Sequence, residues 1–136
     1  MTKLALIILL LGLTPVSAGE IYYEPMDYKA FNQSLQEGTD KASPRTNNPV
    51  IVALNFIGPT EALEQTIIKK NESAEASDTT VIIITNEGLL DDSVQSVKYK
   101  IALKKTNNIW FVQSALKAHK CWQGRGHSDY SAKPCN

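Results

Sequence analysis

The stretch VKYKIALK, residues 97–104, decides the fold class. Its apolar residues alternate with lysines, which is the period of two expected of a β-strand with one wet face. Thr106-Asn107-Asn108 follows as a turn, and the apolar segment 109–118 returns behind it. The pattern predicts a long antiparallel hairpin.

Three earlier segments supply further candidate strands. Residues 79–85 hold four consecutive β-branched apolar residues, which predicts a strand buried on both faces. Residues 60–70 fit a helix behind a Thr60 cap or a strand, and the strand is favoured because a turn through 71–78 would pair it with the next one. Residues 50–57 are apolar and β-branched between Pro49 and Gly58-Pro59, which predicts a buried strand.

One helix is expected ahead of these strands. Pro25 suits a first helical turn, Tyr28, Phe31 and Leu35 share one face, and Gly38 offers a stop. Residues 39–49 are polar and predict a loop. The order predicts an α+β fold: an N-terminal helix packed on a four- to five-stranded antiparallel meander, with a disulfide-closed tail. Residues 19–49 and 50–136 form one domain in this interpretation.

The first 18 residues predict a signal peptide. Lys3 precedes an apolar run over 4–13, and Val16-Ser17-Ala18 suits cleavage near Ala18. The run is shorter than the roughly 20 residues of a membrane span. We therefore expect an exported protein, periplasmic or secreted, with no membrane span; an uncleaved first helix is the alternative.

Charge and cysteine content limit the classes of partner and of site that we expect for this chain. The 14 basic and 14 acidic residues cancel, and removing Lys3 leaves a formal charge near −1, which argues against nucleic-acid binding. In an exported chain the pair Cys121 and Cys135 predicts a disulfide. His119 and His127 would complete a set of zinc ligands, but the spacing matches no familiar zinc module, so no metal or cofactor is predicted.

The tail segment Gly124-Arg125-Gly126-His127, with Asp129 behind it, is the candidate binding site. The glycines allow a tight turn, the guanidinium suits an anion, and histidine titrates near neutral pH. In the structural alternative, Arg125 pairs with Asp129 or with backbone carbonyls, and His127 locks the tail to the sheet. This alternative is favoured, because buried polar groups are usually kept for hydrogen bonding.

A second candidate is Asp91-Asp92-Ser93. Adjacent carboxylates suit a calcium ion or acid–base chemistry, but these residues are also common in turns, which is the favoured interpretation.

Three segments together resemble a family of uncharacterised exported bacterial proteins. They are Gly88–Val94 with its Asp-Asp-Ser-Val sequence, Trp110, and the Cys121…Gly-Arg-Gly-His…Cys135 ending. The resemblance covers about the last third of the chain and brings no assigned activity. It implies that the tail and the Asp-Asp-Ser-Val segment belong to one structural unit.

The leading hypothesis for function is a non-enzymatic binding or structural domain with an unidentified envelope or extracellular partner. The sequence does not specify the oligomeric state. The alternative is a small hydrolase or isomerase with a pocket between helix and sheet, using His127 and Asp91 or Asp92. No catalytic residue is assigned.

Overall fold

The computed structural model describes residues 19–38, 47–75 and 78–136. The predicted signal peptide and most of the predicted 39–49 loop lie outside these residues. The elements, in chain order, are β1 (Glu24–Pro25), α1 (Lys29–Gly38), α3 (Pro49–Ile57), β2 (Glu64–Lys70), β3 (Thr79–Glu87), β4 (Val94–Thr106) and β5 (Ile109–Cys121). The α+β prediction is confirmed.

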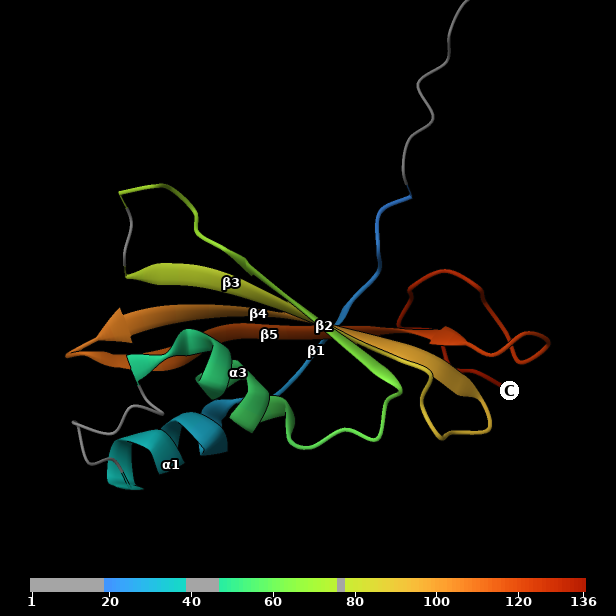
Figure 1. Cartoon of the computed structure of the whole chain (residues 1–136), viewed down its shortest axis with the longest axis horizontal. Coiled ribbons are helices and arrows are strands. Elements are labelled where there is room, and N and C mark those ends of the chain that lie inside the picture. The colour runs from blue at the N-terminus through green and yellow to red at the C-terminus, as the bar shows by residue number, and fades with distance from the viewer. Residues whose placement is uncertain (1–18, 39–46, 76–77) are drawn as a thin grey trace, which may run out of the picture.

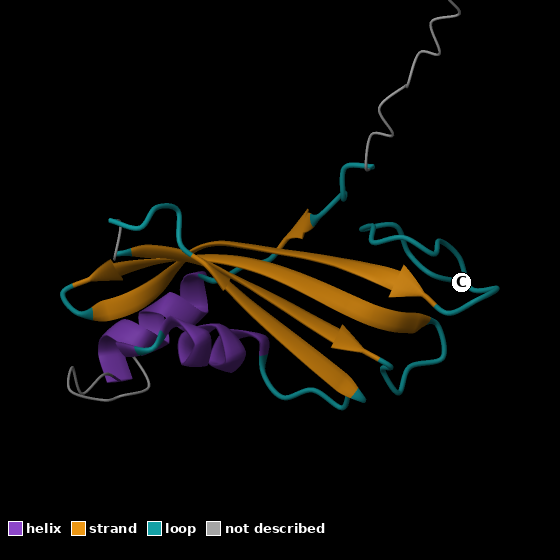
Figure 2. Ribbon diagram, turned by 45° about the horizontal axis from the view of Figure 1, so that its top comes forward, coloured by secondary structure: helices purple, strands orange, loops and turns teal. Residues whose placement is uncertain are grey.

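The strands form one antiparallel sheet in the order β1-β5-β4-β3-β2. Four of the predicted strands form the meander β2 to β5, and β1 adds a short fifth strand beside β5. Both helices lie on one face of the sheet, and the C-terminal tail lies at the opposite end of the long strands (Figures 1 and 2). The core lies between helices and sheet and includes Val52, Ala53, Ile82, Ile101 and Val112.

The prediction of a strand over 50–57 is wrong, because this segment is helix α3. Asn48 caps the helix, its side chain accepting a hydrogen bond from the Val50 amide, and Pro49 occupies the first turn. The flanking Pro49 and Gly58 thus start and stop a helix. An apolar run of this length does not by its pattern distinguish a buried helix from a buried strand. Packing against β3 and β5 selects the helix.

The predicted start of the first helix is also wrong. Pro25 lies in β1, opposite Leu116 of β5, and the helix begins at Lys29, whose amide donates to the Asp27 side chain. Proline is tolerated in an edge strand because its missing N–H can face away from the sheet. The predicted apolar face is confirmed: Tyr28 lies just before the helix, and with Phe31 and Leu35 it packs against the core.

The strand favoured for residues 60–70 is confirmed over Glu64–Lys70. The expectation of burial on both faces of residues 81–84 is wrong. Ile82 and Ile84 are fully buried under the helices, whereas Val81 and Ile83 are half-buried on the other face. Both helices lie on one face, so the sheet alternates as an antiparallel sheet with one solvated side does.

Several separate groups form hydrogen bonds with the backbone along the outer edge of β5. The Asn32 side chain donates to the Val112 carbonyl at 2.8 Å and accepts from its amide at 3.0 Å. Farther along, β1 pairs with β5, and Ser131 of the tail exchanges two backbone hydrogen bonds with His119. This edge is therefore largely closed to strand addition.

The β4–β5 hairpin turns through Asn107 and Asn108, whose φ angles of 50° and 66° are tolerated best by asparagine and glycine. The register slips once near this turn, leaving Gln113 as the extra residue of a β-bulge. A bulge redirects side chains locally. Among the described residues, no helix is long and apolar enough to cross a membrane.

Candidate functional site

The C-terminal residues 121–136, called the clasp below, fold back onto the end of β5. The Cys121–Cys135 disulfide is formed, with Cα atoms 5.6 Å apart, as predicted. The clasp returns beside its own strand through the Ser131–His119 bridge, and the Cys121 amide donates to the His127 carbonyl at 3.0 Å. The clasp is thus fixed to the sheet by both covalent and backbone bonds.

The two glycines around Arg125 have different roles. Gly124 has a φ of 82°, which permits the tight turn closed by the Arg125 amide and the Trp122 carbonyl. Gly126 passes so close to the disulfide that a Cβ there would lie 2.9 Å from the Cys121 sulfur. The clasp therefore needs a residue without a side chain at this position.

The His127 ring is committed to the main chain. Its Nδ1 lies 2.8 Å from the Asp129 carbonyl oxygen and its Nε2 lies 2.7 Å from that of Lys133. A carbonyl oxygen only accepts, so a hydrogen bond to it needs an N–H on the ring nitrogen. His119 also directs its Nε2 to the Lys133 carbonyl, at 2.6 Å. In this arrangement both ring nitrogens of His127 are directed at backbone carbonyls of the clasp.

Asp91 also bonds to the main chain, through one of its two carboxylate oxygens. Its carboxylate accepts hydrogen bonds from the amides of Ser93 and Val94, as the turn interpretation predicts. These two amides hold the pKa of Asp91 below its usual value. The small cavity that Asp91 borders is lined mainly by the α3–β2 connection and the β3–β4 turn, and His127 is not among its described lining residues.

The β3–β4 turn and the clasp are joined by three hydrogen bonds. The Trp122 indole donates to the Asp91 carbonyl, the Trp122 amide donates to the Ser93 carbonyl, and the Ser93 hydroxyl donates to the Asn136 carbonyl. The two segments thus form one contiguous unit at the end of the sheet. Their residues are used to hold that unit together.

Tyr130 fixes the clasp to the sheet face opposite the helices. Its hydroxyl lies 2.7 Å from the Ser96 hydroxyl, and the ammonium groups of Lys98 and Lys120 lie 4.1 and 4.7 Å from the ring centroid. Burial raises the pKa of Tyr130. Lys98 and Lys120 are therefore partly engaged in cation–π contacts with this ring.

The remaining predicted site residues do not converge. Arg125 and Asp129 are exposed, and within the described parts of the chain no ion pair joins them. Arg125 is held by its main chain, through Trp122 and Asn136, while its guanidinium faces solvent. Among the described residues, the carbonyl contacts predicted for the Arg125 side chain are not made, and the His127 ring contacts carbonyls of the clasp itself.

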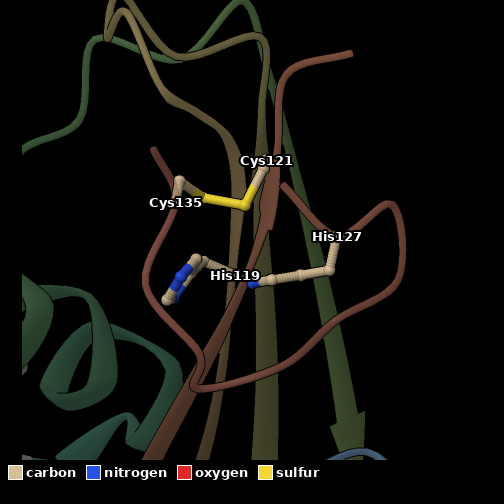
Figure 3. Close-up of side chains that lie close together, drawn as sticks. All are labelled: His119, Cys121, His127 and Cys135. Atoms are coloured by element: carbon tan, nitrogen blue, oxygen red, sulfur yellow. A yellow bond between two sulfur atoms is a disulfide. The ribbon is translucent and has the colours of Figure 1, made fainter. Parts of the chain in front are cut away.

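The structure does bring together the four residues considered as zinc ligands. One ligand atom from each of His119, Cys121, His127 and Cys135 lies within 4.8 Å of the other three (Figure 3). The disulfide occupies both sulfurs, so this oxidised form does not offer a four-ligand metal site.

A different feature, which the sequence did not reveal, is a groove of about 650 Å³ between α1 and the β4–β5 hairpin. Five of its described lining residues carry carboxamides, and none of them carries a carboxylate. The lining comprises Tyr28, Lys29, Asn32, Gln33, Gln36, Thr106, Asn107, Ile109, Phe111 and Gln113. No sequence signal marks it, since scattered amides are typical of any solvated surface.

Searches against protein-family models, curated proteins and solved structures found no match to this chain.

Proposed function

We infer that this chain is an exported, non-enzymatic binding domain whose groove between α1 and the β4–β5 hairpin takes a neutral polyhydroxylated ligand, such as a saccharide of the cell envelope. The single observation that carries this proposal is the lining of the groove by five residues with carboxamides, together with Tyr28, Thr106 and Phe111. A carboxamide donates and accepts at once, which suits neighbouring sugar hydroxyls. An aromatic ring offers an apolar face to sugar C–H groups.

The fixed position of the lining supports a preformed site. Asn32 is held by Val112, and the Tyr28 hydroxyl donates to the Gln113 carbonyl at 2.7 Å. The bulge at Gln113 places an exposed side chain beside the groove. At Asn32 and Tyr28 a ligand meets groups that are already held in place, which lowers the entropic cost of binding.

Binding is favoured over catalysis by the state of the acid–base candidates. Both His127 ring nitrogens and one carboxylate oxygen of Asp91 are hydrogen-bonded to backbone groups. Most glycoside hydrolases use a pair of carboxylates, and the described groove lining carries none. The described groove lining therefore lacks the pair of carboxylates that such catalysis uses.

Export is supported by the disulfide and by the 1–18 segment. Cleavage near Ala18 and a periplasmic or extracellular location are parts of the proposal. N-terminal sequencing of the protein from the envelope fraction should give Gly19 as the first residue, and an intact Met1 there would contradict the cleavage.

The binding proposal is tested by titrating the protein spanning residues 19–136 with neutral oligomers of N-acetylglucosamine, glucose and mannose, followed by saturation-transfer NMR and calorimetry. We expect at least one oligomer to bind, and Phe111→Ala and Gln113→Ala to weaken it tenfold or more. Gln123→Ala is the matched control, since Gln123 is an exposed amide on the clasp. Absence of binding to the whole panel, or unchanged affinity in Phe111→Ala, contradicts the proposal.

One further variant separates the groove from the clasp as the binding site. Arg125→Ala removes the exposed guanidinium and should leave saccharide binding unchanged. Loss of binding in Arg125→Ala, with normal binding in the groove variants, would move the site to the clasp.

A further inference from the structure

We propose that the dithiol form of this chain binds one Zn²⁺ through His119, Cys121, His127 and Cys135, so that the disulfide and the metal are alternative ways of closing the clasp. The observation behind the proposal is the mutual distance of at most 4.8 Å among the four ligand atoms. Two thiolates and two imidazoles are a ligand set found in structural zinc sites.

The fold supplies the ligands in two pairs. His119 and Cys121 are two residues apart on β5, and alternate residues of a strand share a face. His127 and Cys135 come from the clasp, which is returned to the strand by its backbone bonds to His119 and Cys121. These backbone bonds do not involve the sulfurs, so they can hold the four side chains together when the disulfide is open.

The movement required is small. Zn–S bonds of about 2.3 Å and Zn–N bonds of about 2.0–2.1 Å place the donor atoms of a tetrahedral site roughly 3.3–3.8 Å apart. The most distant donors must approach by about 1 Å, and the sulfurs must separate from their bonded 2.03 Å. With the cysteine Cα atoms 5.6 Å apart, side-chain rotation can supply that separation.

The histidines have suitable second partners. Metal-bound histidines commonly donate their other ring N–H to a backbone carbonyl, which fixes the ring. His119 already directs one nitrogen to the Lys133 carbonyl, and its other nitrogen has no partner in the described part of the chain. His127 uses both nitrogens, so one of its two carbonyl contacts opens when the metal binds.

The site is reachable from solvent. Cys121 is buried, but His119, His127 and Cys135 are each half-exposed. Two thiolates neutralise the charge of the ion, so the closed clasp would carry no net charge from the metal centre.

The chemistry balances without an oxidant or reductant at the binding step. The chain is synthesised with two thiols, and Zn²⁺ binding forms two Zn–S bonds and releases the two thiol protons. Later oxidation by a disulfide oxidant removes two electrons from the thiolates, forms the Cys121–Cys135 bond and releases Zn²⁺. The oxidant is reduced to a dithiol in the same step.

The test starts from the protein of residues 19–136, reduced with a water-soluble phosphine. The phosphine breaks the S–S bond, is itself converted to the phosphine oxide, and is removed without air before titration with Co²⁺ and then Zn²⁺. We expect one Co²⁺ per chain with the d–d absorption of a tetrahedral site and a thiolate-to-cobalt band, both lost on adding Zn²⁺. The oxidised protein should show neither band.

The variants assign the ligands. Replacing both cysteines by serine should abolish the thiolate-to-cobalt band, and His119→Ala or His127→Ala should weaken zinc binding at least tenfold. Asp129→Ala is the matched control, a carboxylate of the same clasp outside the four ligands, and should bind zinc normally. Unchanged affinity in both histidine variants overturns the proposal, because the metal would then be held by the thiols alone.

A second readout does not depend on whether a variant folds. Bound Zn²⁺ should slow alkylation of both thiols of the reduced wild-type protein, and a chelator should restore the rate. Equal alkylation rates with and without zinc overturn the proposal, as does the absence of a thiolate-to-cobalt band in the reduced wild-type protein.

Discussion

Asn32→Ala is the substitution whose effect follows most directly from the structure. It removes both hydrogen bonds between the Asn32 side chain and the main chain of Val112. Val112 is only 1% exposed, so its amide and carbonyl are poorly placed to find water. A buried backbone group left without a partner costs about 1–3 kcal/mol. Two such groups cost about 2–6 kcal/mol, and the better helix propensity of alanine offsets about 0.5 kcal/mol.

This loss is large for a domain whose stability is of the order of 5–15 kcal/mol. Urea denaturation followed by tryptophan fluorescence should show a midpoint lower by roughly 1–4 M, for an unchanged slope of about 1.5 kcal/mol/M. The control is Gln33→Ala, one residue along the same helix, which removes only an exposed bond to Glu37 and should change stability by less than about 0.5 kcal/mol. If Asn32→Ala is as stable as this control, the Asn32 side chain does not stabilise the edge of β5.

Three further substitutions test the clasp and its turn. Gly126→Ala should destabilise the oxidised protein in thermal melts, because its Cβ would lie 2.9 Å from the Cys121 sulfur; the penalty should shrink when both cysteines are serine, and an equal penalty would refute the steric cause. Replacing Cys121 and Cys135 by serine should cost about 3 kcal/mol in urea denaturation, from the chain entropy of a loop this long, and a loss under 1 kcal/mol would contradict it. Asp91 has a folded-state pKa below its unfolded value, so its contribution is present above about pH 4 and is lost as pH falls through the folded pKa. Asp91→Asn should therefore flatten the acid limb of a stability–pH profile, and an unchanged limb would assign it to other groups.

The β-hairpin could be predicted because its determinants are local. Residues 97–104 alternate in the sequence as they do in space, with Ile101 and Leu103 buried and Lys100 and Lys104 exposed. The turn through Asn107 and Asn108 is likewise a local preference for left-handed backbone. Two cysteines in a chain with an export-like leader are enough to indicate a disulfide.

Helix α3 could not be predicted in the same way. Its apolar residues suit a buried segment of either kind, and only contacts with strands distant in the sequence favour the helix. The partial exposure of Val81 and Ile83 could not be predicted from the sequence for the same reason, because it also depends on contacts between distant segments. No pattern within β3 indicates that α1 and α3 lie on the same side of the sheet. The other side of the sheet is therefore left to solvent.

The strand periods, the hairpin turn and the cysteine pair could be predicted from the sequence, because the pattern for each is visible along the chain. Which distant groups meet depends on the packing of the whole chain. This packing commits His127 and Asp91 to backbone groups, and it gathers His119, Cys121, His127 and Cys135 within 4.8 Å although their spacing suggests no metal site. It also forms the amide-lined groove, whose residues come from α1 and the β4–β5 hairpin. The physical reason is that side-chain proximity across elements depends on how the chain packs, and local sequence encodes that only indirectly.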